Sequence, residues 1–123
     1  NINKQTMFTV DERVELAEAV LAHLSNVTVM PVTGLIVDFT EQQGATAILR
    51  GLRAVSDFEF EFQLASMNRN LKPDIETLFM TPAEQYAYIS SSLVKEVARF
   101  NGDVSMFLHP LVLERLKQKL AAQ

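Results

Sequence analysis

The chain has 123 residues, of which 48% are hydrophobic and 21% charged, a composition typical of one folded domain rather than a disordered chain. It has no cysteine, which excludes disulfides, thiolate nucleophiles and cysteine-based zinc sites. The formal net charge of -4 argues against a general nucleic-acid binder, and no apolar run is long enough to span a membrane. Since no signal peptide is visible either, we expect one cytoplasmic domain over residues 1–123, with neither nucleic acid nor membrane as a partner.

Helix and strand patterns alternate in the first half of the chain. Thr9 and Glu12 have the spacing of a capping box and predict a helix over about residues 9–24. The β-branched stretch at residues 27–30 predicts a short strand, and a second helix is expected from about residue 35 to its end at Gly44. Residues 45–49 follow as a strand with almost no polar alternation, which predicts burial on both faces of the strand.

The next helix carries more apolar residues than one buried face requires. Ser56 and Glu59 have the spacing of a second capping box, and the helix they open is expected to run to about Asn70. Its apolar residues form two stripes, which favours cover on more than one side, a partner subunit being one candidate.

A third strand and two further helices complete the expected fold. The strand is predicted at residues 75–80, and the helices are expected from Ser90 to about Phe100 and from Pro110 towards the C-terminus. Strands that alternate with helices are typically parallel and joined by right-handed crossovers. The sequence therefore predicts an α/β fold with an open parallel sheet.

Two segments at strand ends carry the candidate anion site. Arg50, Gly51 and Arg53 directly follow one strand, and the serines at residues 90–92 begin a helix after the next strand. Ligands of open parallel sheets bind beyond the carboxyl ends of the strands, where guanidinium groups and free helical N–H groups suit phosphate oxygens. Surface ion pairs for the arginines and simple capping by the serines are the alternatives. The convergence of both segments on one edge favours a phosphate site.

Three segments together resemble the bacterial phosphopantetheine adenylyltransferases: RGLRAVSDFEFE at residues 50–61, Met67-Asn68, and YISSSLVKEV at residues 88–97. The resemblance extends from Lys4 to the C-terminus and implies a Rossmann-like sheet with helices on both faces. It also implies an enzyme of coenzyme A biosynthesis, which transfers an adenylyl group from ATP to 4′-phosphopantetheine and gives dephospho-coenzyme A and pyrophosphate. Magnesium as cofactor, coenzyme A as a further ligand and a cytoplasmic homohexamer are part of what the resemblance implies.

The resemblance also implies which residues bind the two substrates. Lys4 and Arg50 would bind the phosphate of the acceptor, and Leu35 and Ile36 would line its pantetheine arm. The residues that would bind ATP are Gly51, Leu52, Arg53, Glu61, Tyr86, Ala87, Tyr88, Ile89, Ser90, Ser91 and Ser92. No metal ligand is expected in the chain, and neither of its histidines, His23 and His109, is expected to be catalytic.

One motif of that family has no counterpart in the chain. It reads G-x-F-D-P-x-T-x-G-H and supplies a histidine that stabilises the transition state. We therefore expect these residues to be the remainder of a longer protein, without the first two strands of its sheet, that binds ligands weakly at best and has essentially no turnover. Two further hypotheses stay open: a non-catalytic domain that binds a nucleotide or coenzyme A, and a structural assembly subunit that uses the phenylalanine-rich helix.

Overall fold

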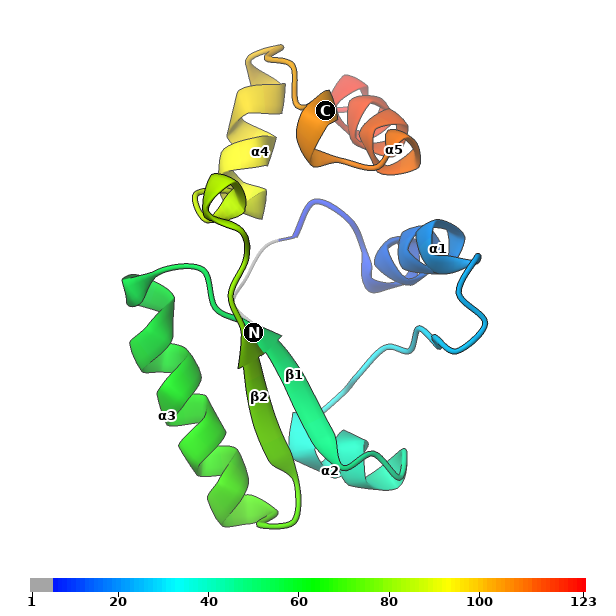
Figure 1. The fold of residues 1–123 in the computed structure, drawn as a ribbon. Helices are drawn as coiled ribbons and strands as arrows, with labels where there is room; N and C mark the ends of the chain where they lie inside the picture. Colours follow the sequence, from blue (N-terminus) through cyan, green and yellow to red (C-terminus); the bar gives the residue numbers. More distant parts are fainter. Residues whose placement is uncertain (1–5) are drawn as a thin grey trace. The chain divides into compact units, whose positions relative to one another are not determined.

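The computed structural model describes residues 6–123, apart from the side chains of residues 55 and 56 (Figure 1). Internal contacts divide the chain into two compact units. We call residues 32–89 the sheet unit, and residues 1–31 together with 90–123 the helical unit. No helix within residues 6–123 is long and apolar enough to cross a membrane.

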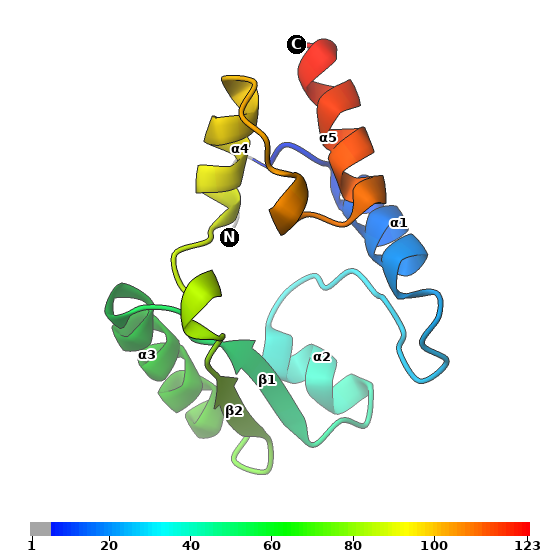
Figure 2. The ribbon, with the colours of Figure 1, turned by 45° about the horizontal axis from the view of Figure 1, so that its top comes forward.

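The sheet unit contains two parallel strands joined by a long helix. Strands β1 (Ala47–Gly51) and β2 (Glu76–Met80) pair with Leu49 opposite Leu78, and helix α3 (Val55–Leu71) connects them. Figures 1 and 2 show α3 along one side of the strands and helix α2 (Ile36–Gln42) on the other side. The parallel pairing predicted from the alternation of elements is confirmed.

The two faces of this small sheet differ in exposure. Arg50 lies on the face towards α3, where it contacts Glu61, and the residues of that face are half-buried. On the opposite face, Leu49, Leu78 and Met80 are exposed by 62%, 54% and 60%. The prediction that residues 45–49 are buried on both faces is therefore wrong, because α2 leaves this face uncovered within residues 6–123.

Helix α2 ends where the sequence predicts. Gly44 adopts a left-handed conformation with φ of +70°, which a glycine accepts without strain, and its N–H donates to the Glu41 carbonyl at 3.0 Å. Inside the helix, Val37 is fully buried and the buried Thr40 hydroxyl donates to the Ile36 carbonyl at 2.7 Å. These two residues anchor α2 in the core of the sheet unit.

Helix α3 starts before the position that its capping pattern indicates. Its first residue is Val55 and its N-cap is Ala54, whose extended backbone leads directly into the helix. Ser56 therefore lies inside the first turn, and the predicted capping box of Ser56 and Glu59 is wrong. An S-x-x-E pattern reports only a local preference, and here the chain enters the helix without a side-chain cap.

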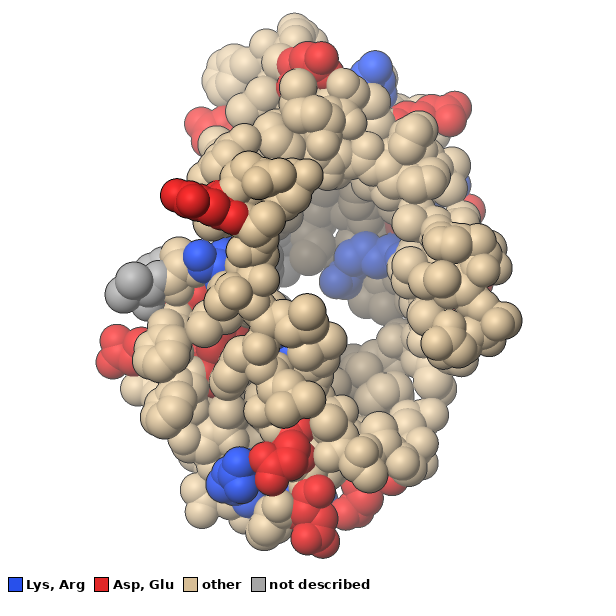
Figure 3. Space-filling model, viewed as in Figure 1, with Lys and Arg blue, Asp and Glu red and all other residues tan. Residues whose placement is uncertain are grey.

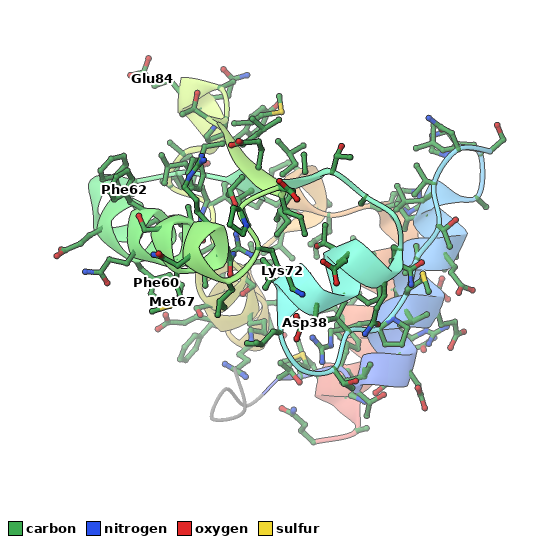
Figure 4. The ribbon with its side chains drawn as sticks, turned by 90° about the horizontal axis from the view of Figure 1, so that it is seen from below. Asp38, Phe60, Phe62, Met67, Lys72 and Glu84 are labelled. Atoms are coloured by element: carbon green, nitrogen blue, oxygen red, sulfur yellow. The ribbon has the colours of Figure 1, made fainter. Side chains whose placement is uncertain are left out.

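Two opposite flanks of α3 carry exposed apolar side chains. Phe58 and Phe62 stack at 5.8 Å between ring centroids on one flank, and the helical spacing places Phe60, Met67 and Leu71 on the other. Figure 4 shows Phe62 on one side of the helix and Phe60 with Met67 on the other. All five side chains are exposed by 47% or more, so the cover that the two stripes predict is not supplied within residues 6–123.

The helical unit contains α1 (Val10–Leu21), α4 (Ser91–Arg99) and α5 (Pro110–Ala121). The predicted capping box before α1 is confirmed, because the Glu12 N–H donates to the Thr9 hydroxyl at 3.1 Å and the Thr9 N–H donates to the Glu12 carboxylate at 3.0 Å. The buried apolar residues of this unit are Leu16, Val94, Val104 and Leu116.

Ion pairs tie α1 to α5. Lys119 donates to both carboxylate oxygens of Glu12, at 2.6 and 2.8 Å, and Arg115 donates to Glu15 at 3.0 Å. The hydrogen bond from Lys119, followed by that from the Thr9 backbone, lowers the pKa of Glu12 to about 2. The carboxylate of Glu12 therefore serves both the cap of α1 and its attachment to α5.

The strand predicted at residues 27–30 is wrong. These residues lie after α1 and pair with no strand among the residues that the structure describes. β-Branched residues favour an extended backbone, but a strand forms only where a neighbouring strand offers backbone partners.

Candidate functional site

The carboxyl edge of the sheet, defined here by residues 50–53, carries the two arginines singled out from the sequence. The Leu52 N–H donates to the Met80 carbonyl at 2.9 Å, which prolongs the pairing of β1 with β2 past the last strand residue. Because this bond ties the backbone of Leu52 to the end of β2, Arg50 and Arg53 lie at an ordered edge of the sheet rather than in a free loop.

Arg50 forms a two-bond ion pair with Glu61, in the second turn of α3. Its Nε donates to Glu61 Oε2 at 2.8 Å, and its Nη2 donates to Glu61 Oε1 at 2.6 Å. The side chain of Arg50 is 39% exposed, whereas that of Glu61 is only 12% exposed. Glu61 is therefore the shielded partner, and Arg50 is the more exposed one.

The pair fixes the charge of both groups. The hydrogen bonds from Arg50 hold the pKa of the Glu61 carboxyl below its ordinary value of 4.5, although desolvation by burial opposes this shift. In the same way, the hydrogen bonds to Glu61 raise the pKa of the Arg50 guanidinium above its ordinary value. Both groups are consequently ionised at neutral pH.

Arg53 attaches the end of β1 to the segment that follows β2. Its Nη1 donates to the Ile89 carbonyl at 2.5 Å, and its Nε lies 3.4 Å from the Asp57 carboxylate one helical turn away. The surface ion pair that was the alternative for this arginine is thus present with Asp57. The bond to Ile89 goes beyond that alternative, because it joins two segments 36 residues apart.

Residues 86–89 form a tight turn in the sheet unit. A short 3-10 helix, Glu84–Tyr86, precedes it, the Ala87 N–H donates to the Glu84 carbonyl, and the Ile89 N–H donates to the Tyr86 carbonyl at 3.2 Å. Tyr86 and Tyr88 are exposed by 52% and 62%. Both aromatic rings therefore offer surface to a ligand that reaches this turn.

The predicted serines lie at the start of α4, in the helical unit. The Ser90 hydroxyl accepts the Leu93 N–H at 3.1 Å, so Ser90 is the N-cap, as one of the two alternatives predicted. Ser91 and Ser92 occupy the exposed first turn. The N-terminal turn of a nine-residue helix leaves backbone N–H groups for an acceptor, and such groups suit an anion.

The residues predicted for the pantetheine arm open α2. Leu35 is its N-cap and is 56% exposed, and Ile36 is its first residue. Lys4, the second residue predicted for the acceptor phosphate, lies outside the described residues.

Glu61 was predicted as an ATP ligand, and its contact with Arg50 was not predicted. The helix that begins at Val55 places Glu61 on the same face as Asn68, which is 5% exposed and faces the core. A glutamate on the buried face of a helix needs a cation, and Arg50 on the adjacent strand supplies it. That signal becomes available only when the start of α3 is known.

The amino edge of the sheet carries a different set of charges. Arg69 pairs with Glu76 at 2.8 Å, and Lys72 pairs with Glu41 at 3.1 Å and with Asp38 at 3.9 Å. Figure 4 shows Lys72 beside Asp38, and Figure 3 shows basic and acidic side chains next to each other at the lower end of the sheet unit. Arg69 and the three carboxylates are exposed and Lys72 is half-buried, which is typical of ion pairs at a solvated surface.

Metal ligands do not cluster in the described part of the chain. Within residues 6–123 there is no group of three or more histidine, cysteine, aspartate or glutamate side chains that could hold a metal ion.

Comparison with known proteins identifies the family. Residues 1–97 match the cytidylyltransferase-like family. Phosphopantetheine adenylyltransferases from Thiobacillus denitrificans and Nitrosomonas eutropha are both 59% identical to the chain, over 96% and 94% of its length. The same enzyme from Methylobacillus flagellatus is 57% identical over 96% of the chain. The chain belongs to the phosphopantetheine adenylyltransferases.

This membership confirms the resemblance that the motifs carry, and the α/β structure agrees with the Rossmann-like fold of nucleotidyltransferases. The chain covers 74%, 71% and 74% of the three relatives, so these proteins are longer than the sequence described here.

Proposed function

We propose that the protein transfers an adenylyl group from ATP to 4′-phosphopantetheine, giving dephospho-coenzyme A and pyrophosphate. The observation that carries the proposal is the partly exposed side chain of Arg50, whose guanidinium is oriented by Glu61 at the carboxyl edge of the sheet and which is followed directly by Gly51. Membership of the phosphopantetheine adenylyltransferases supports the identity of both substrates.

The proposed reaction joins two polyanions. An oxygen of the acceptor phosphate attacks the α-phosphorus of ATP, a new P–O bond forms, and the bond to the departing pyrophosphate breaks. The protein has to neutralise charge and align the reactants, and no covalent nucleophile is required. Arg50 supplies donors for the acceptor phosphate, and Arg53, joined to Ile89, braces the turn that offers Tyr86 and Tyr88 to the nucleotide.

The remaining substrate contacts follow the family pattern. Lys4 is proposed to assist Arg50 at the acceptor phosphate, and Leu35 and Ile36 to line the pantetheine arm. The residues proposed for ATP are Gly51, Leu52, Arg53, Glu61, residues 86–89 and the α4 start at Ser90, Ser91 and Ser92. Exposure of Leu35 and of the first turn of α4 supports these assignments, because a ligand can reach them.

Magnesium is proposed to arrive with the phosphates of ATP. Enzymes of this type hold Mg²⁺ mainly through substrate phosphates, with few protein carboxylates. This suits a chain whose described residues include no cage of ligating side chains. When bound, the ion would reduce the negative charge of the phosphates.

A cytoplasmic homohexamer is the proposed state of assembly. The five exposed apolar residues on the flanks of α3 support self-association, since exposed apolar patches mark interaction surfaces. Sedimentation equilibrium tests the proposal by measuring the mass of the protein in solution, which is expected to be six times the 13.8 kDa of one chain. A monomer at micromolar concentration would contradict the proposal.

A second candidate function is binding of a nucleotide or coenzyme A without catalysis. It is favoured by the positions of the two histidines: His109 caps α5, where its Nδ1 accepts the Leu111 N–H at 3.1 Å, and His23 lies just after α1. The Nδ1 of His109 therefore serves the cap of α5 within the helical unit.

Calorimetry and a pyrophosphate assay test the two candidates. We expect 4′-phosphopantetheine to bind the chain more tightly than pantetheine, and Arg50→Ala to remove that difference, about 10–100-fold in Kd, since a hydrogen bond to a charged group contributes about 1.5–3 kcal/mol. Pyrophosphate release that requires both substrates supports the transferase. Binding of both without release supports the second candidate for the 123-residue chain, and it agrees with the expectation that these residues alone have essentially no turnover. Equal affinity for the two pantetheine compounds would contradict the proposed acceptor site.

A further inference from the structure

The Arg50–Glu61 pair uses the hydrogen-bond donors on one side of the guanidinium and leaves those on the other side for a ligand. Glu61 occupies the Nε–H and one N–H of Nη2. A guanidinium has five N–H donors, and among the described residues Glu61 takes two of them, so the two on Nη1 and the second on Nη2 remain for another acceptor there. The two bonded donors point towards the Glu61 carboxylate. The side chain of Glu61 is shielded, with 12% exposed, whereas the side chain of Arg50 is 39% exposed.

Glu61 itself is held by the fold. It lies in the interior of α3, two turns before the buried Asn68, and its partner lies on a strand that is fixed by pairing with β2. A long arginine side chain has considerable rotamer freedom, which an unrestrained side chain would lose on binding a phosphate. A carboxylate that already fixes the guanidinium removes this freedom before the ligand arrives.

We infer that Glu61 is a positioning residue, which holds the Arg50 guanidinium so that its three uncommitted N–H donors meet the phosphate of the acceptor. The inference rests on the proposed function, because it takes 4′-phosphopantetheine as the ligand of Arg50. It deepens the family-based assignment of Glu61, in which this residue binds ATP, by giving its carboxylate a role towards the other substrate.

Two other roles of the Arg50–Glu61 pair predict different effects on ligand binding when Glu61 is removed. In the first, the pair only fastens α3 to β1, and its loss affects all ligands alike. In the second, Glu61 competes with the phosphate for Arg50, and its removal tightens binding. The bidentate contact argues against competition, because Glu61 bonds Nε and Nη2 but not Nη1 and needs no displacement when a phosphate binds Nη1.

The test compares two ligands and two glutamates by titration calorimetry on the 123-residue chain. The ligands are 4′-phosphopantetheine and pantetheine, which lacks the phosphate. Glu61→Gln is expected to weaken binding of 4′-phosphopantetheine about tenfold and to leave pantetheine binding unchanged. The matched control is Glu76→Gln, which breaks the ion pair between this β2 residue and Arg69 of α3 and is expected to change neither affinity.

Each remaining outcome decides the question. Equal loss for both ligands assigns Glu61 a fastening role only, and unchanged or tighter binding of 4′-phosphopantetheine also overturns the inference while leaving the proposed function intact. Failure of the unaltered chain to distinguish 4′-phosphopantetheine from pantetheine overturns the proposed function, and the inference with it.

A measurement on the unaltered chain covers the case in which Glu61→Gln does not fold. The Nε–H resonance of Arg50, assigned by its absence in Arg50→Lys, reports whether the bond to Glu61 persists. We expect this resonance to stay in place when 4′-phosphopantetheine is added. Movement of the resonance to the position of a solvated arginine would show that the pair opens on binding, and would overturn the inference.

Discussion

The two ends of α3 both carry an arginine–glutamate pair, yet the pairs lie in different surroundings. At the carboxyl edge of the sheet, Arg50 meets Glu61 with two hydrogen bonds, and the carboxylate is 12% exposed. At the amino edge, Arg69 meets Glu76 with one bond, and the two side chains are 62% and 54% exposed. The residue types are the same, so their place in the fold decides what each pair contributes.

This comparison separates a site from a surface. Ion pairs in water contribute little, because solvent screens the charges and mobile side chains lose entropy when they pair. A shielded, doubly bonded carboxylate is different, since removing its partner leaves a charge with poor solvation. The charged residues in the sequence are alike at both ends of α3, so the sequence alone does not show which ion pair contributes more. The bond number and the exposure of the two pairs distinguish them.

The largest effect on stability is expected at the carboxyl edge. Glu61→Ala should lower the free energy of unfolding by about 1–2 kcal/mol, towards the lower part of the range for charged hydrogen bonds because Arg50 remains partly solvated. Urea denaturation followed by circular dichroism measures this quantity. A loss no greater than that of an exposed pair would remove the distinction between the two ends.

Lowering the pH sharpens the same comparison. The pKa of Glu61 is lower in the folded chain than its ordinary 4.5, so the unfolded chain takes up the proton first as the pH falls. The stabilisation from this pair is therefore complete above about pH 4.5 and is lost as the pH falls through the lowered value. Urea denaturation at a series of pH values should show the stability difference between the unaltered chain and Glu61→Gln shrinking only below that range.

A smaller gain is expected from a new cap at the start of α3. Ala54 has the extended backbone of an N-cap residue, with φ of -144° and ψ of 163°, but no oxygen to accept a helical N–H. Ala54→Ser should raise the free energy of unfolding by about 0.5–1 kcal/mol. Thermal denaturation measures the gain, and Ser90→Ala, which removes the cap of α4, should give a loss of similar size. No gain in Ala54→Ser would mean that the serine does not cap the helix.

The smallest effect belongs to the amino edge. Glu76→Ala should change the free energy of unfolding by no more than about 0.5 kcal/mol, since both partners are largely solvated. Added salt should leave even that difference smaller. A loss as large as that of Glu61→Ala would show that exposure does not rank these pairs.

Local signals predict local structure well in this chain. The capping box of Thr9 and Glu12, the glycine that ends α2 and the serine that begins α4 all act through residues within one helical turn. Residues 27–30 and Ser56 show the limit of such signals. A strand needs a partner that the local sequence does not name, and a capping pattern can be bypassed when the helix begins earlier.

In the candidate site, the motifs likewise predict which residues take part but not which contacts they make. The motifs pointed to Arg50 and Arg53 as residues of the carboxyl edge, and the structure agrees on that position. The pairing of Arg50 with Glu61 joins residues 11 apart, and that of Arg53 with Ile89 joins residues 36 apart. Both depend on how α3 and the turn after β2 fold back on the sheet, which residue types alone do not determine.

The opposed flanks of α3 set a geometric condition on the proposed hexamer. A single two-fold partner covers one flank of the helix, and Phe60 and Phe62 lie on different flanks. If copies of the chain cover both flanks, each copy touches at least two neighbours. Contacts that repeat from copy to copy close into a ring when the rotation between neighbours divides a full turn, and otherwise continue into an open filament. The angle between the two phenylalanine flanks thus helps to decide whether assembly stops at a finite number of copies.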